Sequence, residues 1–421
     1  MHLIPFNKPF LVGSEIEYIR EAILSGKLSG NGKFTKMSQN WFEKELQINK
    51  ALLTTSCTDA LEMAAILLDI QPGDEVILPS YTFVSTANAF ALRGAKLVFA
   101  DSRADHPGID EESLESLITS KTKAIVPVHY AGVACDMDVI SSLALRHNLN
   151  VVEDAAQAID SFFLSKNGEK LPLGSIGNLA AFSFHETKNI ISGEGGLLAI
   201  KDDQFSARAE IIWEKGTNRS SFFRGEVDKY GWVDIGSSFL PSELNAAFLY
   251  AQLENIEKIQ NKRKNIWNTY EAFFSSMNFD GVRLPFIPDF ATNNAHMFYI
   301  ILSDVKLREE LMNYLKGKGI MGVFHYQSLH KSKYFETKHD GRDLPFTDFH
   351  LHEENRVAKQ LWGRLPNTNA MAMLYFRKGT KVQNLMHSLK YKGKTEVGIK
   401  LGNLLGEKLA ASNDYKNIDL I

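Results

Sequence analysis

The chain has 421 residues, of which 44% are hydrophobic and 23% are charged, and both values are ordinary for a globular protein. Lys+Arg 47 against Asp+Glu 50 leaves a net charge of -3, which argues against a basic nucleic-acid binder. No apolar run approaches the roughly 20 residues that a membrane-spanning helix needs, and the N-terminus lacks the apolar core of a signal peptide. We therefore expect a cytoplasmic protein with no nucleic-acid or membrane partner.

The two cysteines, Cys57 and Cys135, provide neither a disulfide framework nor a zinc-binding pattern. This usage is typical of a reducing compartment. We predict no metal site.

The first segment predicts two helices. Ser14 and Glu17 are spaced as a capping box for a helix over 14–26, and a second helix is predicted over 36–47. The glycine-rich stretch between them, 26–35, lacks the spacing of a phosphate-binding loop of the Walker type. It is either a flexible connection or a loop that contacts substrate.

From residue 51 onward, short apolar runs alternate with segments of helical length, which predicts an α/β fold with a mostly parallel sheet covered on both faces. In such sheets, sites gather beyond the carboxyl ends of the strands. The predicted strands are 51–55, 75–79, 96–100, 124–128, 150–153 and 196–200, and the predicted helices are 84–93, 110–119, 137–147 and 203–215.

A long helical pattern over 241–275 predicts the crossing into a second, smaller α+β domain. That domain contains strand candidates at 297–302 and 322–326 with a helix at 305–317 between them. The predicted organisation is a large domain over 1–275, a small domain over 276–389 and a weakly patterned tail over 390–421.

Polar residues follow several of the predicted strands. In TTSCTDAL (54–61), Ser56 and Thr58 stand at a helix start, where free amides and the helix dipole favour a phosphate group. The alternative is an ordinary helix cap.

In VVEDAAQ (151–157), Asp154 ends a strand and Gln157 follows three residues later. A carboxylate there could keep a ring nitrogen protonated, and Gln157 could reach a neighbouring ring oxygen. The alternative is that Asp154 caps the next helix and Glu153 is solvated.

In FSFHETKNIISGEGG (182–196), Lys188 follows a strand and precedes several glycines. Burial would lower the pKa of its ammonium and free a nucleophile for a Schiff base, although most loop lysines are solvated surface charges. Ser183 offers a further hydroxyl for a phosphate, and Phe83 either stacks on a ring or packs in the core. Phosphate seat, carboxylate and lysine together match the parts of a pyridoxal 5'-phosphate (PLP) site.

These motifs, in the order TSCTDAL, PSYTFVSTANA, VVEDAAQ and FSFHETKN…GEGG, resemble the DegT/DnrJ/EryC1/StrS sugar aminotransferases over roughly residues 3–330. The resemblance implies the type I PLP-dependent transferase fold, as in aspartate aminotransferase. It is closest to the branch that makes dTDP-4-amino-4,6-dideoxygalactose from dTDP-4-dehydro-6-deoxyglucose and L-glutamate for enterobacterial common antigen. A related branch, which dehydrates sugars, has histidine in place of the lysine, and Lys188 argues against it.

The resemblance also implies roles for residues. Lys188 becomes the Schiff-base lysine and Asp154 the partner of the pyridine nitrogen. In the family, a second subunit completes the site with an asparagine, and Ser238 stands at that position here, which implies a homodimer with shared sites. Gln157 becomes the ring-oxygen contact, Phe83 the stacking residue, and the phosphate shell consists of Ser56, Cys57 and Ser183.

Four further residues are candidates for the sugar side of the pocket, although loop residues of these types are often structural or solvated: His129, Tyr130, His325 and His330. A non-catalytic nucleotide-sugar binding protein on the same scaffold is the alternative function, and it would not need Lys188.

Overall fold

A computed structural model of the protein describes residues 3–277, 279, 281–303 and 305–347. Contacts divide the chain into one unit from Met1 to Glu353 and another from Glu354 to Ile421. The predicted tail over 390–421 and the end of the predicted small domain lie outside the described residues. The domain boundary near 276 stays a prediction.

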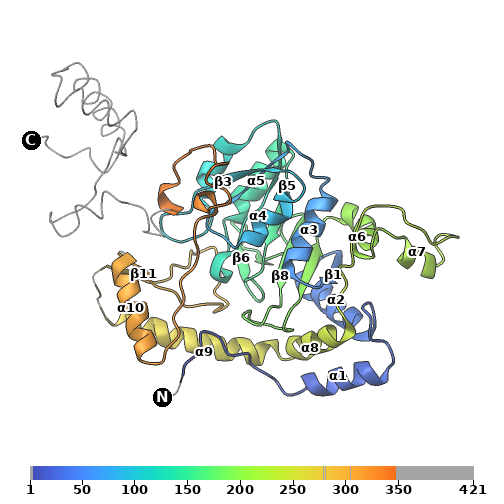
Figure 1. Ribbon diagram of the computed structural model, residues 1–421, viewed down its shortest axis with the longest axis horizontal. Helices are drawn as coiled ribbons and strands as arrows, with labels where there is room; N and C mark the ends of the chain where they lie inside the picture. The colour runs from blue at the N-terminus through green and yellow to red at the C-terminus, as the bar shows by residue number, and fades with distance from the viewer. Residues whose placement is uncertain (1–2, 278, 280, 304, 348–421) are drawn as a thin grey trace, which may run out of the picture. The chain divides into compact units, whose positions relative to one another are not determined.

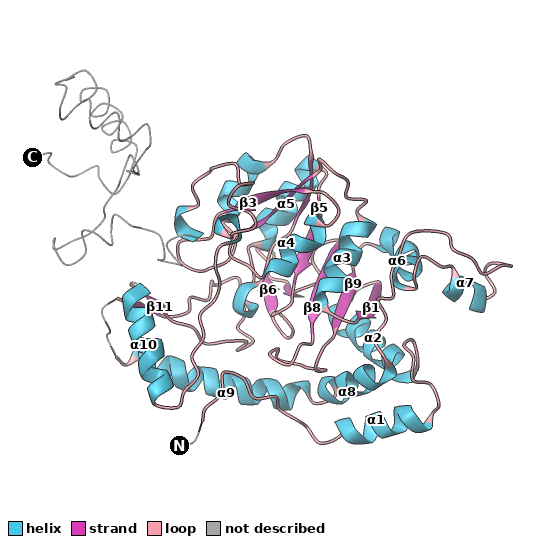
Figure 2. Ribbon diagram, in the orientation of Figure 1, coloured by secondary structure: helices cyan, strands magenta, loops and turns pink. Residues whose placement is uncertain are grey.

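The described part of the chain is built on a seven-stranded sheet (Figure 2). Its strands are β1 (Lys50–Thr54), β2 (Glu75–Pro79), β3 (Lys96–Ala100), β4 (Thr122–Ile125), β5 (Asn150–Asp154), β8 (Leu179–Ser183) and β9 (Gly196–Ile200). They are arranged in the order β1-β9-β8-β5-β4-β2-β3, and β9 alone in this sheet runs antiparallel to its neighbours. The mostly parallel α/β sheet predicted from the sequence is confirmed.

Helices lie along both faces of this sheet (Figure 1). Their bounds are α1 (Glu15–Leu24), α2 (Lys33–Leu46), α3 (Cys57–Leu67), α4 (Val84–Ala91), α5 (Met137–His147), α6 (Ser206–Trp213), α7 (Arg219–Phe223), α8 (Glu243–Leu253), α9 (Ile256–Ser275) and α10 (Val305–Gly317). No described helix is both long and apolar enough to cross a membrane.

Two apolar cores fill the space between the sheet and its helices. Side chains alternate between the two faces of a strand, so in β2 Ile77 joins one core whereas Val76 and Leu78 join the other. The first core takes residues from α2, α5 and α8, and the second takes residues from α3, α4 and α6. Each core therefore covers one face of the sheet, and the ends of the strands remain available for a site.

The predicted capping box at the first helix is wrong. Ser14 has helical backbone angles, and its side chain makes no capping hydrogen bond. The buried Glu15 instead accepts hydrogen bonds from the amides of Val12 and Gly13, each at 2.8 Å, and from Gln252 of α8 at 2.6 Å. A long-range polar contact therefore replaces the local cap.

The long helix predicted over 241–275 is two helices, α8 and α9, separated at Glu254–Asn255. The strand predicted over 297–302 shrinks to β11 (Ile301–Leu302), which pairs with β10 (Val282–Arg283). The carbonyls just before it accept hydrogen bonds from α9 instead of from a neighbouring strand: Arg263 donates to Ala295 and His296, and Trp267 donates to Met297.

Other differences are local. Residues 322–326 form no strand, and the carbonyl of His325 accepts a hydrogen bond from the hydroxyl of Tyr81. The predicted helix over 110–119 is a 3-10 helix, Glu111–Leu117, and β4 stops before Pro127, which has no amide hydrogen for a strand ladder. A hairpin of β6 (Phe162–Leu164) and β7 (Lys170–Pro172) escaped prediction because of its shortness.

Candidate active site

The ends of three strands meet at one edge of the sheet. Ser183 at the end of β8 and Thr54 at the end of β1 both pair with Gly196, one on each side of β9. Asp154 at the end of β5 pairs with Ala181 of β8. The segments that carry Ser56, Asp154 and Lys188 therefore leave the sheet at adjacent positions.

The start of α3 forms an anion seat at this edge. Ser56 caps the helix by accepting the amide of Asp59 at 3.1 Å, and within the described residues the amides of Cys57 and Thr58 make no hydrogen bond. A Cβ atom on Gly196 would lie 2.3 Å from the carbonyl carbon of Ser56, so only glycine allows this close approach. The free amides and the helix dipole suit a phosphate group.

Asp154 lies buried beside this seat. Its Oδ2 accepts a hydrogen bond from the hydroxyl of Thr86 in α4 at 2.7 Å, and its Oδ1 accepts one from the amide of Ala156 at 3.1 Å. Turns follow it, so Asp154 caps no helix and that alternative is wrong. The side chain is held in place with oxygen lone pairs still able to accept from a ligand.

Glu153, on the opposite face of β5, is fully buried, and the alternative of a solvated Glu153 is therefore wrong. Its two oxygens accept from Nε2 of His129 at 2.8 Å and from the amides of Gly174, Ile176 and Gly177 at 2.7–2.8 Å. Burial alone would raise the pKa of Glu153, but these hydrogen bonds, that of His129 first, lower it. The carboxylate of Glu153 therefore has a structural role, because it holds His129 and the segment 174–177 against β5.

Replacing Glu153 with glutamine is expected to lower the free energy of unfolding by about 3–5 kcal/mol, because an amide nitrogen would face backbone amides that need an acceptor. The folded pKa lies below the ordinary value of 4.5. The stabilisation by Glu153 is therefore full above that pH and is lost as the pH falls through the folded pKa. Chemical denaturation from pH 3 to pH 7 should show a weaker acid dependence in the variant, and an unchanged slope would contradict this role.

Gln157 is oriented by the turn that follows β4. Its Oε1 accepts the amide of Ala131 at 2.6 Å, which directs the Nε2 donor to the other side. A side-chain hydrogen bond from Gln157 to Tyr326 acts to lower the pKa of that tyrosine. Burial and the charge of Asp154 nevertheless raise the pKa of Tyr326 to about 12. Gln157, Asp154 and Tyr326 therefore share one polar space.

Lys188 lies in the turn after β8, where its amide donates to the carbonyl of His185 at 2.8 Å. Burial lowers the pKa of its ammonium, while the charge of Asp154 acts in the opposite direction. Lys188 also acts to lower the pKa of the Cys57 thiol, so the lysine lies near both the start of α3 and the end of β5. Burial and Asp154 also raise the pKa of the Cys57 thiol, so Cys57 is a neutral member of the seat.

Aromatic side chains from separate segments adjoin the polar space. Phe83, at the start of α4, is 57% exposed, so the alternative of core packing does not hold for it. Its ring centroid lies 6.2 Å from that of Tyr326. A tyrosine cluster surrounds Tyr326, with members that contact one another at centroid distances of 5.2–6.3 Å: Tyr81, Tyr130, Tyr299 and Tyr326.

The four candidates for sugar contacts occupy different environments. His325 stacks on Tyr326 at 4.3 Å and Tyr130 belongs to the tyrosine cluster, so both adjoin the site. His129 is fully buried, with Nε2 on Glu153 and Nδ1 accepting the amide of Cys135, which corrects the prediction that it contacts a sugar. His330 is also buried, and its Nδ1 pairs with the hydroxyl of Ser80 at 2.7 Å.

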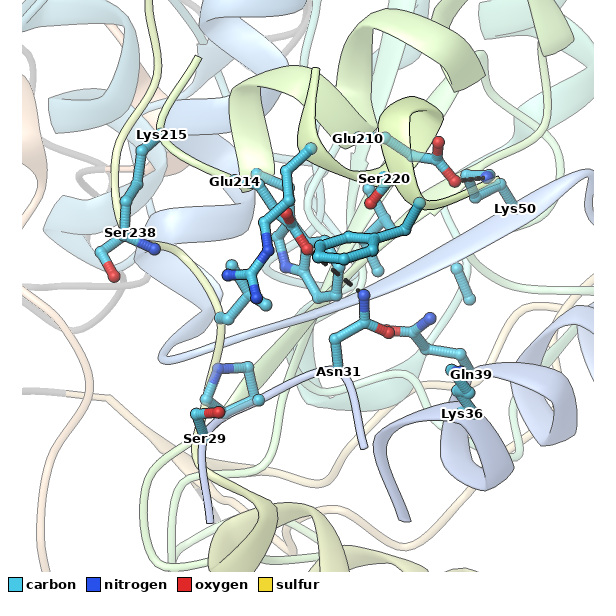
Figure 3. Close-up of a pocket in the computed structure, with 18 of the residues that line it drawn as sticks. Ser29, Asn31, Lys36, Gln39, Lys50, Glu210, Glu214, Lys215, Ser220 and Ser238 are labelled. Carbon is cyan, nitrogen blue, oxygen red and sulfur yellow. Dashed lines mark hydrogen bonds and ion pairs between the residues drawn. The ribbon is translucent and has the colours of Figure 1, made fainter. Parts of the chain in front are cut away.

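Ser238 lines a cavity of about 820 Å³ beside the edge strand β1 (Figure 3). In Figure 3, Asn31 and Glu214 point toward each other, and they share a hydrogen bond of 3.3 Å. The glycine-rich stretch 26–35 contributes Lys27 and Ser29 to the lining of this cavity. Lys188, Asp154, Gln157 and Phe83 do not line the cavity, and Ser238 is exposed.

Sequence reasoning missed Thr86, Tyr326 and His296. The threonine that holds Asp154 lies in PSYTFVSTANA, where its spacing from Phe83 by three residues could have suggested a shared helix face. Tyr326 lay in an apolar run that predicted a strand. No local pattern marks His296, because its partner Asn189 is 107 residues away.

Comparison with known proteins decides the family. Residues 10–390 match the DegT/DnrJ/EryC1/StrS aminotransferase family. The chain belongs to this family. It is 32% identical over 356 residues to the spore coat polysaccharide biosynthesis protein SpsC of Bacillus subtilis, covering 82% of this chain and 88% of that protein.

Solved structures agree with this assignment. The aminotransferase TlmJ from Streptoalloteichus hindustanus matches with a TM-score of 0.75 and 27% identity, covering 83% of this chain and 92% of that one. Spr1654 from Streptococcus pneumoniae, described as a putative sugar aminotransferase, matches in its PMP form with a TM-score of 0.74 and 25% identity, covering 83% of this chain and 90% of that one. The protein is a PLP-dependent aminotransferase of the type I fold.

The residues present fit PLP. The free amides at the start of α3 can bind the phosphate of PLP. The fixed carboxylate of Asp154 can pair with the pyridine nitrogen. Gln157 offers a donor, Phe83 an exposed ring, and Lys188 an amine with a lowered pKa.

Proposed function

We propose that this aminotransferase moves the amino group of L-glutamate to the C4 keto group of a nucleotide-linked 6-deoxy sugar. The proposed substrate is dTDP-4-dehydro-6-deoxyglucose, and the product is dTDP-4-amino-4,6-dideoxygalactose. The segments PSYTFVSTANAFALRGAK, VPVHYAGVACDMD and NAHMFYI resemble this branch of the family and support the proposal. The similarity to SpsC, a spore coat polysaccharide biosynthesis protein, supports a sugar substrate. We place the enzyme in the cytoplasm, in the synthesis of enterobacterial common antigen.

The observation that carries the sugar assignment is the tyrosine cluster beside the carboxylate and the lysine. Burial raises the pKa values of Tyr299 and Tyr326, which are only partly buried, so their hydroxyls stay protonated and can donate hydrogen bonds. Aromatic faces pack against the C–H groups of a sugar ring, and phenol hydroxyls bond its oxygens. A small amino acid alone would not need so wide an aromatic wall.

When bound, PLP supplies a ring that absorbs the electron pair left as a substrate carbon loses its proton. Lys188 carries the cofactor at rest and moves the proton as general acid and base. Asp154 keeps the ring nitrogen protonated. The start of α3, with Ser56, Cys57 and Ser183, binds the phosphate, while Gln157 donates to the ring oxygen and Phe83 packs on the ring.

We propose a homodimer in which Ser238 reaches the phosphate of the partner's cofactor. The segment around it exposes an unusual number of apolar side chains, which a second copy would cover. In Figure 1, α7 extends away from the sheet on this segment. The exposed residues are Phe222, Phe223, Tyr230, Trp232, Val233 and Ile235.

The test is incubation of the purified protein with L-glutamate and a panel of nucleotide-linked 4-keto sugars, with the configuration of the product at C4 determined by NMR. We expect an amino sugar of galacto configuration from the dTDP substrate. A deoxygenated product without an amine would indicate a dehydratase, and binding without turnover would indicate a non-catalytic binding protein. Either result would overturn the proposal.

A further inference from the structure

Lys188 is followed by Asn189, whose side-chain amide has both its nitrogen and its oxygen engaged. The buried Asn189 donates through Nδ2 to Oε1 of Gln260 and to the carbonyl of Asn294, both at 2.9 Å. Its Oδ1 lies 2.8 Å from Nδ1 of His296. Because both donor hydrogens of Asn189 are used elsewhere, Nδ1 of His296 must be the donor in this pair. The lysine turn is therefore tied to residues 294–296.

Residues 294–296 also hold the backbone of Gln157. The side chain of Asn294 is fully buried, and its Nδ2 donates to the carbonyls of Gln157 and Ile159, each at 2.8 Å. Its Oδ1 accepts the amide of His296 at 3.0 Å. A Cβ atom on Gly132 would lie 2.1 Å from Oδ1 of Asn294, so the turn that orients Gln157 through Ala131 packs directly on this side chain.

Helix α9 fixes residues 294–296 from behind. Gln260 donates to the carbonyl of Asn294, and Arg263 donates to those of Ala295 and His296. These two residues are three apart, so they share one helix face. The turn therefore has little freedom to move against the lysine or against Gln157.

We propose that His296 and Asn189 are positioning residues that hold Lys188 at a fixed place relative to Gln157. They act through the Nδ1 hydrogen bond between them. His296 contacts neither substrate nor cofactor in this account. The inference rests on the assignment of Lys188 and Gln157 in the proposed function.

The electrostatic surroundings agree with this role. Burial and the charges of Lys188, Arg263 and His325 lower the pKa of His296 well below its ordinary value, so the imidazole is neutral. The charged and titratable groups that act on Lys188 are Cys57 from α3 and Asp154 from β5, and Lys188 in turn lowers the pKa values of His296 and His325. A neutral His296 can hold the turn without placing a like charge beside the lysine.

Two substitutions of the same histidine separate the Nδ1 contact from other effects. In His296→Asn, the amide nitrogen stands where Nδ1 stood and can still donate to Asn189. In His296→Gln, the side chain is one carbon longer, and its amide matches Nε2 instead. Asn189→Ser removes the same hydrogen bond from the other side, because its hydroxyl is too short to reach His296. It serves as the second test variant if His296→Gln folds poorly.

The experiment measures, on the PLP-loaded protein without any sugar, the pH midpoint of the visible absorption change and the cofactor dissociation constant. We expect His296→Gln and Asn189→Ser to move the midpoint by about half a unit or more and to weaken cofactor binding about tenfold. His296→Asn should restore both values. In the reaction with the amino donor, kcat should fall more than KM changes.

Three outcomes would overturn the inference. Both histidine variants could match the wild type, His296→Asn could behave as His296→Gln, or the variants could lose thermal stability with an unmoved pH midpoint. Because no sugar is used, failure of the proposed sugar substrate leaves this test intact. Attachment of the cofactor to a lysine other than Lys188 would instead refute the site assignment itself.

Discussion

The variant Lys188→Ala is expected to lose aminotransferase turnover by about 10⁵-fold or more, because it removes the group that both holds the cofactor and moves the proton. The fold should persist, since the lysine side chain makes no ion pair within the described residues. Turnover with glutamate, circular dichroism and the visible spectrum check the two expectations together.

Lys188→Arg is the matched control. It keeps the positive charge and most of the length, but a guanidinium does not lose its proton in proteins and cannot serve as the nucleophile. We expect it to be as inactive as Lys188→Ala. Activity near the wild-type level in either variant would show that another residue carries the chemistry.

The variant Asp154→Asn is expected to lower turnover by about 10²–10³-fold. A neighbouring carboxylate shifts the pKa of a cationic partner by about 1–3 units, and an amide cannot supply that shift. The pH optimum should also move to more acidic values, where the ring nitrogen is still protonated without help. Steady-state rates from pH 5 to pH 9 check both effects.

Thr86→Val provides the graded companion. It keeps the charge of Asp154 and removes the 2.7 Å hydrogen bond that orients it. We expect a loss of about tenfold, because one hydrogen bond to a charged group contributes about 1.5–3 kcal/mol at most. An Asp154→Asn enzyme no worse than Thr86→Val would argue that the carboxylate only packs.

The sheet could be predicted from the sequence because its signals are local. Strands such as 75–79, 96–100 and 196–200 are short apolar runs bounded by turn residues, and the structure has each within the same bounds. The helices over 137–147 and 305–317 also match. The carboxyl ends of parallel strands share one edge of the sheet, so the sequence predicts that the segments of Asp154 and Lys188 meet there.

What could not be predicted depends on contacts between distant segments. In the sequence, Glu153 resembles Asp154 as a carboxylate near a strand end, but the amides at 174–177 bond to it and give it a structural role. His129 is buried for the same reason. Ser14 does not cap the first helix, and Glu15 is instead held by a hydrogen bond from Gln252, far along the chain. Tertiary packing overrides local pattern at each of these positions.

The most direct measurement is reduction of the purified yellow protein with borohydride, followed by digestion and peptide mass spectrometry. Reduction makes the link between a lysine and PLP permanent, so the modified peptide identifies the lysine that binds the cofactor. The peptide that contains Lys188 should carry the added mass of the reduced cofactor, and no other lysine peptide should do so. A cofactor mass on any other lysine, or on none, would contradict the account.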